Sequence, residues 1–397
     1  MLLHLTAIGM KATVVMVCLA LPQVCNALLL LPCAHAGDRW GKKRIGALGL
    51  ALVVTGYTAI TFSPLLSSVA ARSLVVGGIL FYALGLTLWV SVWFALLNPL
   101  VPEQDRAGFF GLTRFSWQSV SAIFGVAFSI LLARHSSPAA FFGMFSIFWL
   151  GWLGTCQQFR RIPEVEKSLG KGLAFGPSLM NVLRTSSYLS FCSYAFLLSL
   201  FVGSCPVLFG MVAKVHLHLP DGTVSLLANL RLMAQIVGFV AGAQVVARLG
   251  TKTVFLASHF GYAAAIFLFL GRQATGLPVI WMVAAAEIMF GLVWAASSVA
   301  FSTEMMALIP REGKALSTSL YNVLQGGGTA LSILLSAAAM DTGLFRDTWI
   351  LHGTELSRYD AALLVCGTLV MVVVVTLGLV PSVIGKTPMN PGDPMRP

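Results

Sequence analysis

Apolar runs of about twenty residues alternate with short polar segments along almost the whole chain. A helix of ~20 apolar residues spans the ~30 Å hydrocarbon core of a bilayer. Counting such windows predicts eleven membrane-spanning helices, at 13–36, 45–67, 73–97, 114–133, 137–159, 186–212, 224–247, 253–271, 277–300, 317–340 and 360–383. The pattern therefore predicts an all-α polytopic membrane protein.

Composition agrees with this pattern. Of the 397 residues, 57% are hydrophobic and only 10% are charged, whereas a soluble domain carries about 25% charged residues. The net charge of +11 does not indicate nucleic-acid binding, because the basic residues lie in short segments between apolar runs. That distribution is typical of loops that face anionic lipid.

The distribution of Lys and Arg predicts the orientation. One side of the membrane receives seventeen of them, in segments 39–44, 106–114, 160–184, 248–252, 311–314 and the C-terminus. The other side receives six, which are Arg72, Arg134, Lys214, Arg272, Arg346 and Arg358. Basic loops stay in the cytoplasm. We therefore expect a multi-pass protein of the plasma (inner) membrane with a cytoplasmic C-terminus.

The longest polar stretch, 160–185, divides the chain and is predicted to be a cytoplasmic linker. It separates a five-helix half, 1–159, from a six-helix half with a short tail, 186–397. The segment RWGKK at 39–43 returns as RLGTK at 248–252, 209 residues later. Val101-Pro102 returns as Ile309-Pro310 at nearly the same offset, on the same side. This agreement indicates a parallel internal repeat.

The repeat also predicts that the first helix of the first half is missing. Span 186–212 has no partner, since the same offset places its counterpart before Met1. We expect either that Met1 is an internal methionine of a longer product or that the chain is truncated. An alternative interpretation ends a signal peptide at Ala34-His35-Ala36. The basic cluster that follows resists translocation and disfavours it.

The densest charge cluster is GDRWGKKR at 37–44, with five charged side chains in eight. It resembles the pattern G-x-x-x-D-R-x-G-R/K-R/K of the major facilitator superfamily, in which Ala34 replaces the first glycine. The matching positions are Asp38, Arg39, Gly41, Lys42 and Lys43. The second copy has Ala247 where the acidic residue would be. The two halves and the central loop extend the resemblance over nearly the whole chain, which implies two parallel-repeat helical bundles.

This loop has a physical explanation beside the resemblance. Its basic residues hold it in the cytoplasm, and Gly41 lets it turn tightly. Asp38 adds nothing to that charge bias. In the family, the acidic residue and its neighbours resemble a latch between helix ends of opposite halves, which implies a gating role. The alternative is that the cluster only fixes the topology.

Two charged residues lie deep in predicted spans, where they usually have a function. Arg231 and Glu287 lie roughly 10 and 15 Å from the outer ends of their helices at ~1.5 Å per residue. Their similar depth allows a salt bridge. The functional interpretation assigns an anionic substrate group to Arg231 and proton coupling to Glu287, both facing water or substrate. The alternative is a structural ion pair.

Other polar residues of the spans are candidates for lining a substrate cavity. The alternative for each is a hydrogen bond between packed helices. The triplet 326–328, Gly-Gly-Gly, predicts close helix approach or helix bending. It does not indicate a phosphate loop, because no Lys-Ser/Thr follows it. The cavity candidates are Gln235, Tyr321, Asn322, Gln325, Gln23, Asn26, Trp117 and Gln118.

No enzyme motif is found in the sequence, which lacks GxSxG, HExxH and nucleotide-binding patterns. We expect no cofactor and no metal site, since His216 and His218 lack further ligands. The resemblance implies a monomeric secondary active transporter, such as a symporter, that moves a small solute by alternating access and is coupled to protons. The alternative is a non-transporting membrane sensor or an inactive truncated paralogue.

Overall fold

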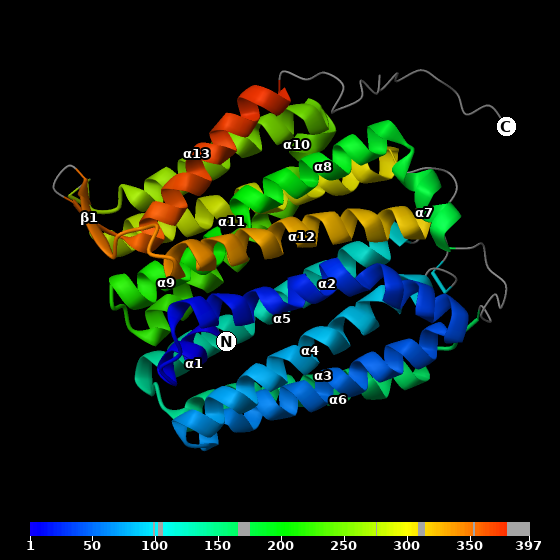
Figure 1. The fold of residues 1–397 in the computed structure, drawn as a ribbon, viewed down its shortest axis with the longest axis horizontal. Helices are drawn as coiled ribbons and strands as arrows, with labels where there is room; N and C mark the ends of the chain where they lie inside the picture. Colours follow the sequence, from blue (N-terminus) through cyan, green and yellow to red (C-terminus); the bar gives the residue numbers. More distant parts are fainter. Residues whose placement is uncertain are drawn as a thin grey trace.

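The computed structural model describes residues 1–97, 100–101, 106–165, 175–274, 276–308, 314–351 and 354–378. Long helices run side by side in one bundle (Figure 1). Nine helices of the described chain are long and apolar enough to cross a membrane. This confirms the predicted all-α membrane architecture. We call the end of the bundle that holds β1 the β1 end and the opposite end the α7 end, as labelled in Figure 1.

The first half follows the predicted spans closely. A short helix and a 3₁₀ turn are added to them, α1 (Leu2–Ala7) and η1 (Ser63–Leu65). The five long helices are α2 (Ala12–Trp40), α3 (Lys42–Phe62), α4 (Ser68–Leu97), α5 (Arg106–Arg134) and α6 (Pro138–Arg161). All of them except α6 begin before their predicted spans, because polar residues at helix ends lie outside an apolar window. In contrast, α3 ends at Phe62, short of the predicted 67, and η1 follows it.

The second half begins with a broken helix. The predicted span 186–212 consists of α8 (Ser186–Val202), α9 (Cys205–Met211) and the π-helix η3 (Val212–His216). A backbone N–H group at the break is satisfied by α12, since Ser204 N–H donates to the hydroxyl of Ser332 at 2.9 Å. The remaining long helices are α10 (Asp221–Leu270), α11 (Val279–Leu308), α12 (Lys314–Asp341) and α13 (Arg358–Gly378).

Besides α1, η1 and the break between α8 and α9, two further elements were not predicted from the sequence. The predicted linker 160–185 contains the helix α7 (Phe175–Leu183), which is amphipathic and too short for a membrane window. A hairpin of β1 (Thr348–Leu351) and β2 (Thr354–Ser357) lies between α12 and α13. Its strands pair antiparallel, with Thr348 opposite Ser357. Both elements lie outside the apolar runs on which the prediction was based.

Two glycines at corresponding positions of the repeat make the same kind of turn. Gly41 separates α2 from α3 with φ 104°, and Gly250 interrupts α10 with φ 76°. A residue other than glycine is strained at such positive φ angles. Gly250 divides α10 into the two predicted spans 224–247 and 253–271. The tight turn predicted at Gly41 is therefore confirmed, and its repeat partner has the same conformation.

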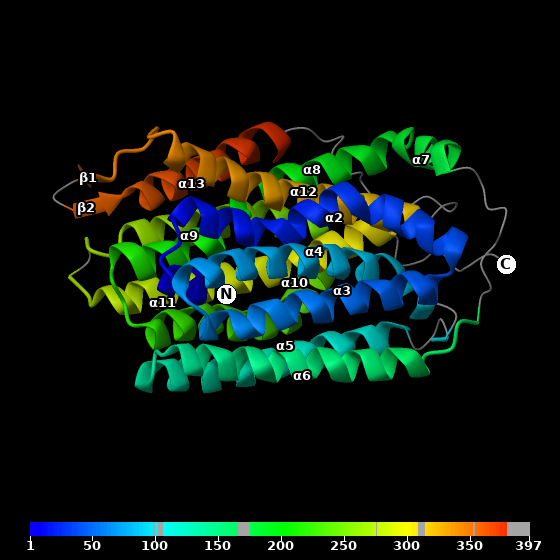
Figure 2. The same cartoon turned by 60° about the horizontal axis from the view of Figure 1, so that its bottom comes forward.

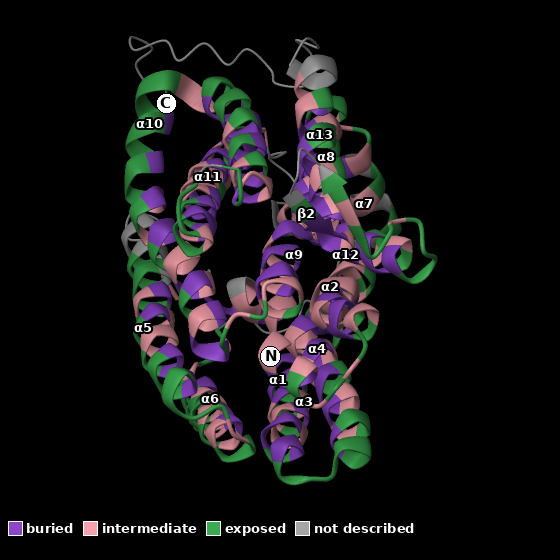
Figure 3. Ribbon diagram, turned by 90° about the vertical axis from the view of Figure 1, so that its left-hand side faces the viewer, coloured by how far each residue is buried: buried purple, intermediate pink, exposed green. Residues whose placement is uncertain are grey.

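Helices of the two halves lie on opposite sides of the bundle. In Figure 2, α3, α5 and α6 lie below, and α8, α12 and α13 lie above. Buried residues gather where helices face one another, and exposed residues cover much of the outside (Figure 3). The halves meet mainly where α2 packs on α12 and α5 packs on α10. These two interfaces position the candidate site.

Candidate functional site

The α5–α10 interface is built from small and polar side chains. The hydroxyl of Ser129 donates to that of Ser225 at 2.9 Å. The amide of Asn229 donates to the carbonyl of Ala122 at 3.2 Å, and a side chain at Gly125 would collide with Asn229 Oδ1. Positions 122, 125, 129 and 133 of α5 recur every three or four residues and so share one face. This face is the contact between the halves.

A charged cluster closes this interface at the β1 end. The hydroxyl of Ser136, in the first half, donates to the carboxylate of Asp221 at the start of α10. The ammonium group of Lys214 pairs with the same carboxylate, whose side chain is only 7% exposed. The sequence analysis did not find this cluster. Its only signal was a Lys and an Asp seven residues apart, on either side of a short turn.

Toward the α7 end, the same faces of α5 and α10 become exposed. Phe115, seven residues before Ala122, is 56% exposed. Met233 and Val240, four and eleven residues after Asn229, are 44% and 61% exposed. Residues at these spacings lie on the same face of a helix. The described contacts between α5 and α10 are therefore concentrated in the half of the interface nearer the β1 end.

The α2–α12 interface depends on the predicted close approach at the glycine triplet. A side chain at Gly326 would meet Gln23 Oε1 at 3.0 Å, and one at Gly328 would collide with the backbone of α8. The triplet thus lets α12 approach both α2 of the first half and α8 of the second. Of the predicted cavity residues, Gln23 lies at this interface. Asn322, one turn before Gly326, is on the same face of α12.

The other amide and aromatic cavity candidates lie in different parts of the structure. Asn26 accepts a hydrogen bond from Thr87 at 2.8 Å, inside the first half. Tyr321 is 7% exposed and stacks on Phe191 of α8 with centroids 5.7 Å apart, inside the second half. Trp117 is 68% exposed. Gln325 is half-buried. The structure therefore does not bring all predicted candidates to one place.

Arg231 and Glu287 form the salt bridge that their similar depth allows. Arg231 Nη1 lies 2.7 Å from Glu287 Oε2, with the side chains 16% and 4% exposed. Gln235, one turn beyond Arg231, is 8% exposed. The expectation that both charges face water or substrate needs correction, because Glu287 is buried between α10 and α11. Arg231 lies about 200° around α10 from Asn229, so it faces away from α5.

The predicted gating loop contacts the end of α6 and the first residues of the predicted linker 160–185. The backbone N–H of Lys43 donates to Glu164 Oε1 at 3.3 Å, and its ammonium group donates to the carbonyl of Arg160 at 3.1 Å. Asp38 and Arg39 are exposed. Asp38 makes no hydrogen bond or ion pair with the residues that the structure describes. Lys42 begins α3 directly after the Gly41 turn.

A second buried ion pair was not predicted. Arg272, at the end of α10, binds Asp360 of α13 through two contacts, Nη1–Oδ1 at 2.7 Å and Nη2–Oδ2 at 3.0 Å. Both side chains are fully buried. Ser357 adds its backbone N–H and its hydroxyl to Asp360 Oδ2, at 2.8 and 2.7 Å. This pair joins α10, α13 and the β hairpin at the β1 end.

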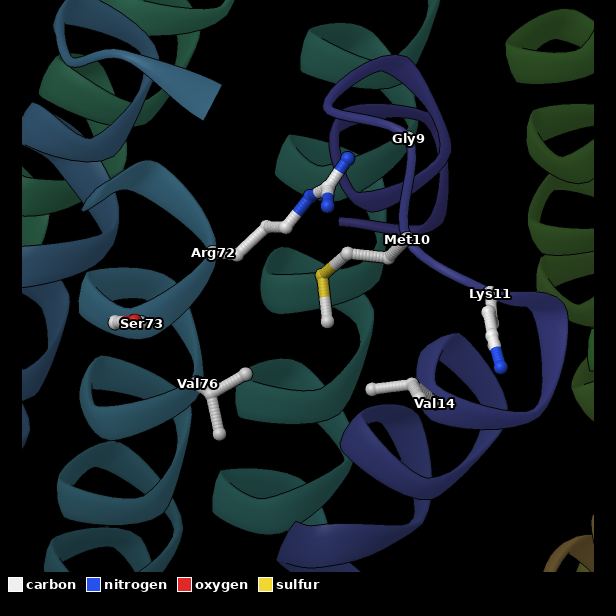
Figure 4. Close-up of a pocket in the computed structure, with 7 residues that line it drawn as sticks. All are labelled: Gly9, Met10, Lys11, Val14, Arg72, Ser73 and Val76. Carbon is white, nitrogen blue, oxygen red and sulfur yellow. The ribbon is translucent and has the colours of Figure 1, made fainter. Parts of the chain in front are cut away.

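A cavity of about 460 Å³ lies at the β1 end of the first half, between the start of α2 and α4. Figure 4 shows the guanidinium group of Arg72 directed toward Gly9. Arg72 Nε donates to the carbonyl of Ile8 at 2.9 Å. Arg72 therefore braces the turn before α2. The cavity is lined by Gly9, Met10, Lys11, Val14, Arg72, Ser73 and Val76.

The family model of the Major Facilitator Superfamily matches residues 1–333. The chain belongs to this superfamily. No curated protein matches it significantly. The superfamily and the helical fold make it an integral multi-pass membrane protein and a secondary transporter, not an enzyme.

Solved structures show the same fold at low sequence identity. The structure of a D-xylose-proton symporter has a TM-score of 0.70 at 12% sequence identity. The match covers 93% of this chain and 88% of the symporter chain. A mutant of the nucleoside transporter NupG has a TM-score of 0.67 at 11% sequence identity. The match covers 95% of this chain and 93% of the mutant. A bacterial homologue of the iron transporter ferroportin, in its inward-facing state, has a TM-score of 0.63 at 16% sequence identity. The match covers 92% of this chain and 91% of the homologue.

Proposed function

We propose that this transporter moves a small solute through the plasma (inner) membrane by rocking its two halves in alternating access. The α7 end, which holds the basic loops, faces the cytoplasm in this proposal. The observation that carries it is the uneven α5–α10 interface. Ser136 and Asp221 join the halves at the β1 end, while Phe115 and Val240 are exposed toward the α7 end. This arrangement is one access state, closed outside.

The gating loop fits the same cycle. Asp38 is exposed, at the end where the helices α5 and α10 are least in contact. In the opposite access state, we expect the loop 38–43 to contact the second half and the Ser136–Asp221 contact to break. Alternating access requires that contacts at one end replace contacts at the other.

We further propose that Glu287 is the proton-coupling group. Its carboxylate is buried, and its salt-bridge partner among the described residues is Arg231. Uptake of a proton by Glu287 would release Arg231, so protonation and the arrangement of α10 against α11 are linked. One protein of the same fold is named a D-xylose-proton symporter, and this supports the proposal. The anion-binding role predicted for Arg231 stays untested.

The test is solute counterflow and proton uptake in proteoliposomes that contain the purified full chain. A radiolabelled panel of sugars, nucleosides, carboxylates and amines identifies the solute, and a luminal pH dye reports proton entry. We expect solute-dependent proton entry in the wild-type protein. Glu287→Gln, which cannot take up the proton, should abolish accumulation driven by a pH gradient while leaving exchange of solute for solute.

Glu355→Gln is the matched control, because Glu355 is an exposed carboxylate of β2. It should transport as the wild type does. If Glu287→Gln still accumulates solute in response to a pH gradient, Glu287 does not couple protons. If no member of the panel is exchanged by the wild-type protein, the alternative of a non-transporting sensor or inactive paralogue is favoured.

A further inference from the structure

Two amide oxygens at the α5–α10 interface have no hydrogen-bond partner among the described residues. They are Gln118 Oε1 and Asn229 Oδ1, in side chains of residues that are 7% and 2% exposed. Buried polar atoms in folded proteins nearly always have a partner. An acceptor without one destabilises the protein by ~1–3 kcal/mol. These two oxygens therefore need an explanation.

Their positions follow the interface toward its exposed part. Gln118 precedes Ala122 by four residues and so lies on the interface face of α5, one turn nearer the α7 end. Asn229 Nδ2 is already used, because it donates to the carbonyl of Ala122. Beyond Gln118 in the same direction, Phe115 is 56% exposed. A solute that enters from the α7 end would thus reach Gln118 first and Asn229 next.

The chemistry of the two oxygens selects for hydrogen-bond donors. Asn229 Oδ1 lies against Gly125, which offers no N–H group at that point of the helix. An anion would be repelled by both oxygens, and Arg231 is paired with Glu287 on the other side of α10. A small cation requires about six oxygen ligands. Asp221, two turns away on α10, is committed to Ser136 and Lys214.

We propose that Gln118 and Asn229 bind the transported solute, and that this solute is neutral and carries hydroxyl or amide N–H donors. The proposal rests on the transport function proposed above. Each unpaired oxygen accepts one donor of the solute, so the interface is complete only when the solute is bound. The unfavourable burial of two unpaired oxygens in the empty protein is then offset by binding.

The test compares uncharged donors with charged solutes on the full-length protein. The uncharged probes are D-glucose, mannitol and uridine; the charged probes are phosphate, citrate and choline. Proteoliposome counterflow and thermal stabilisation in detergent are both measured. We expect exchange and stabilisation by at least one uncharged probe and by none of the charged ones.

The decisive variant is Gln118→Met, which keeps the volume and removes the amide. Loss of one hydrogen bond should weaken binding of the uncharged probe about tenfold. The melting temperature of the solute-free protein should stay the same or rise, because an unpaired buried acceptor has been removed. A merely structural glutamine would lower the melting temperature instead. Gln157→Met is the matched control, because Gln157 is exposed on α6, and it should change neither quantity.

Asn229→Leu is a second variant and should also weaken binding. The proposal is wrong if the transported probe is charged, while the transport function then stands. It is also wrong if Gln118→Met and Asn229→Leu bind the uncharged probe as tightly as the wild type. If no probe of either kind is exchanged, the transport function itself fails, and this inference fails with it.

Discussion

The two buried ion pairs of the second half contain the same chemical groups in different surroundings. Arg272 and Asp360 are both fully buried and share two contacts, and Ser357 gives two further hydrogen bonds to Asp360. Arg231 and Glu287 share one contact, and Arg231 is 16% exposed. Both carboxylate oxygens are bonded at the first site, whereas one is bonded to Arg231 at the second.

We expect this difference to separate a structural pair from one that can change state. A buried charge is costly unless its hydrogen bonds are complete. Both oxygens of Asp360 are bonded, so any rearrangement there loses several bonds at once. At Glu287, a proton can replace a single partner. Position agrees with this, since Arg272–Asp360 joins helix ends at the β1 end and Arg231–Glu287 lies in mid-helix between α10 and α11.

The largest expected effect is that of Asp360→Asn. It leaves the Arg272 guanidinium buried and charged, and should lower the free energy of unfolding by ~3–5 kcal/mol. Denaturant unfolding of the purified protein in detergent measures this. The double variant Arg272→Met/Asp360→Leu removes both charges and should recover most of the loss. A double variant as unstable as the single one would show that the charges are not the cause.

A smaller effect is expected from Arg231→Met. The Glu287 carboxylate that remains can take up a proton and become neutral. The free energy of unfolding should therefore fall by only ~1–3 kcal/mol. The same unfolding measurement applies, at neutral and at mildly acidic pH. The loss should shrink at acidic pH, because the proton replaces the missing partner. A loss as large as that of Asp360→Asn would mean that the two pairs are of one kind.

The smallest effect is expected from Ser357→Ala. It removes the hydroxyl that donates to Asp360 but keeps the backbone N–H, and should cost ~1 kcal/mol. Ser187→Ala is the control, since Ser187 is exposed on α8, and should change stability by less than ~0.5 kcal/mol. An equal result for both serines would show that Asp360 does not depend on this hydrogen bond.

Much of the fold could be predicted because a bilayer imposes a simple rule on sequence. Apolar length located the helices, and the tight turn expected at Gly41 is confirmed by its positive φ angle. Gly250, at the matching offset, also has a positive φ angle. Similar depth allowed a salt bridge between Arg231 and Glu287, which the structure contains, because helix rise converts residue number into depth. Arg272 and Asp360 were missed, since charges near helix ends look like ordinary interface residues when their partner is 88 positions away.

The sequence by itself determined which segments are long and apolar enough to cross a membrane and which family they resemble, because these follow from local composition and motif spacing. Tertiary structure alone decided which face of each helix meets which neighbour. It directed Asn229 to α5 and Arg231 to α11, although the two are only two residues apart on one helix. The physical reason is helix rotation: about 100° per residue separates neighbours in sequence, and only packing fixes where each direction points.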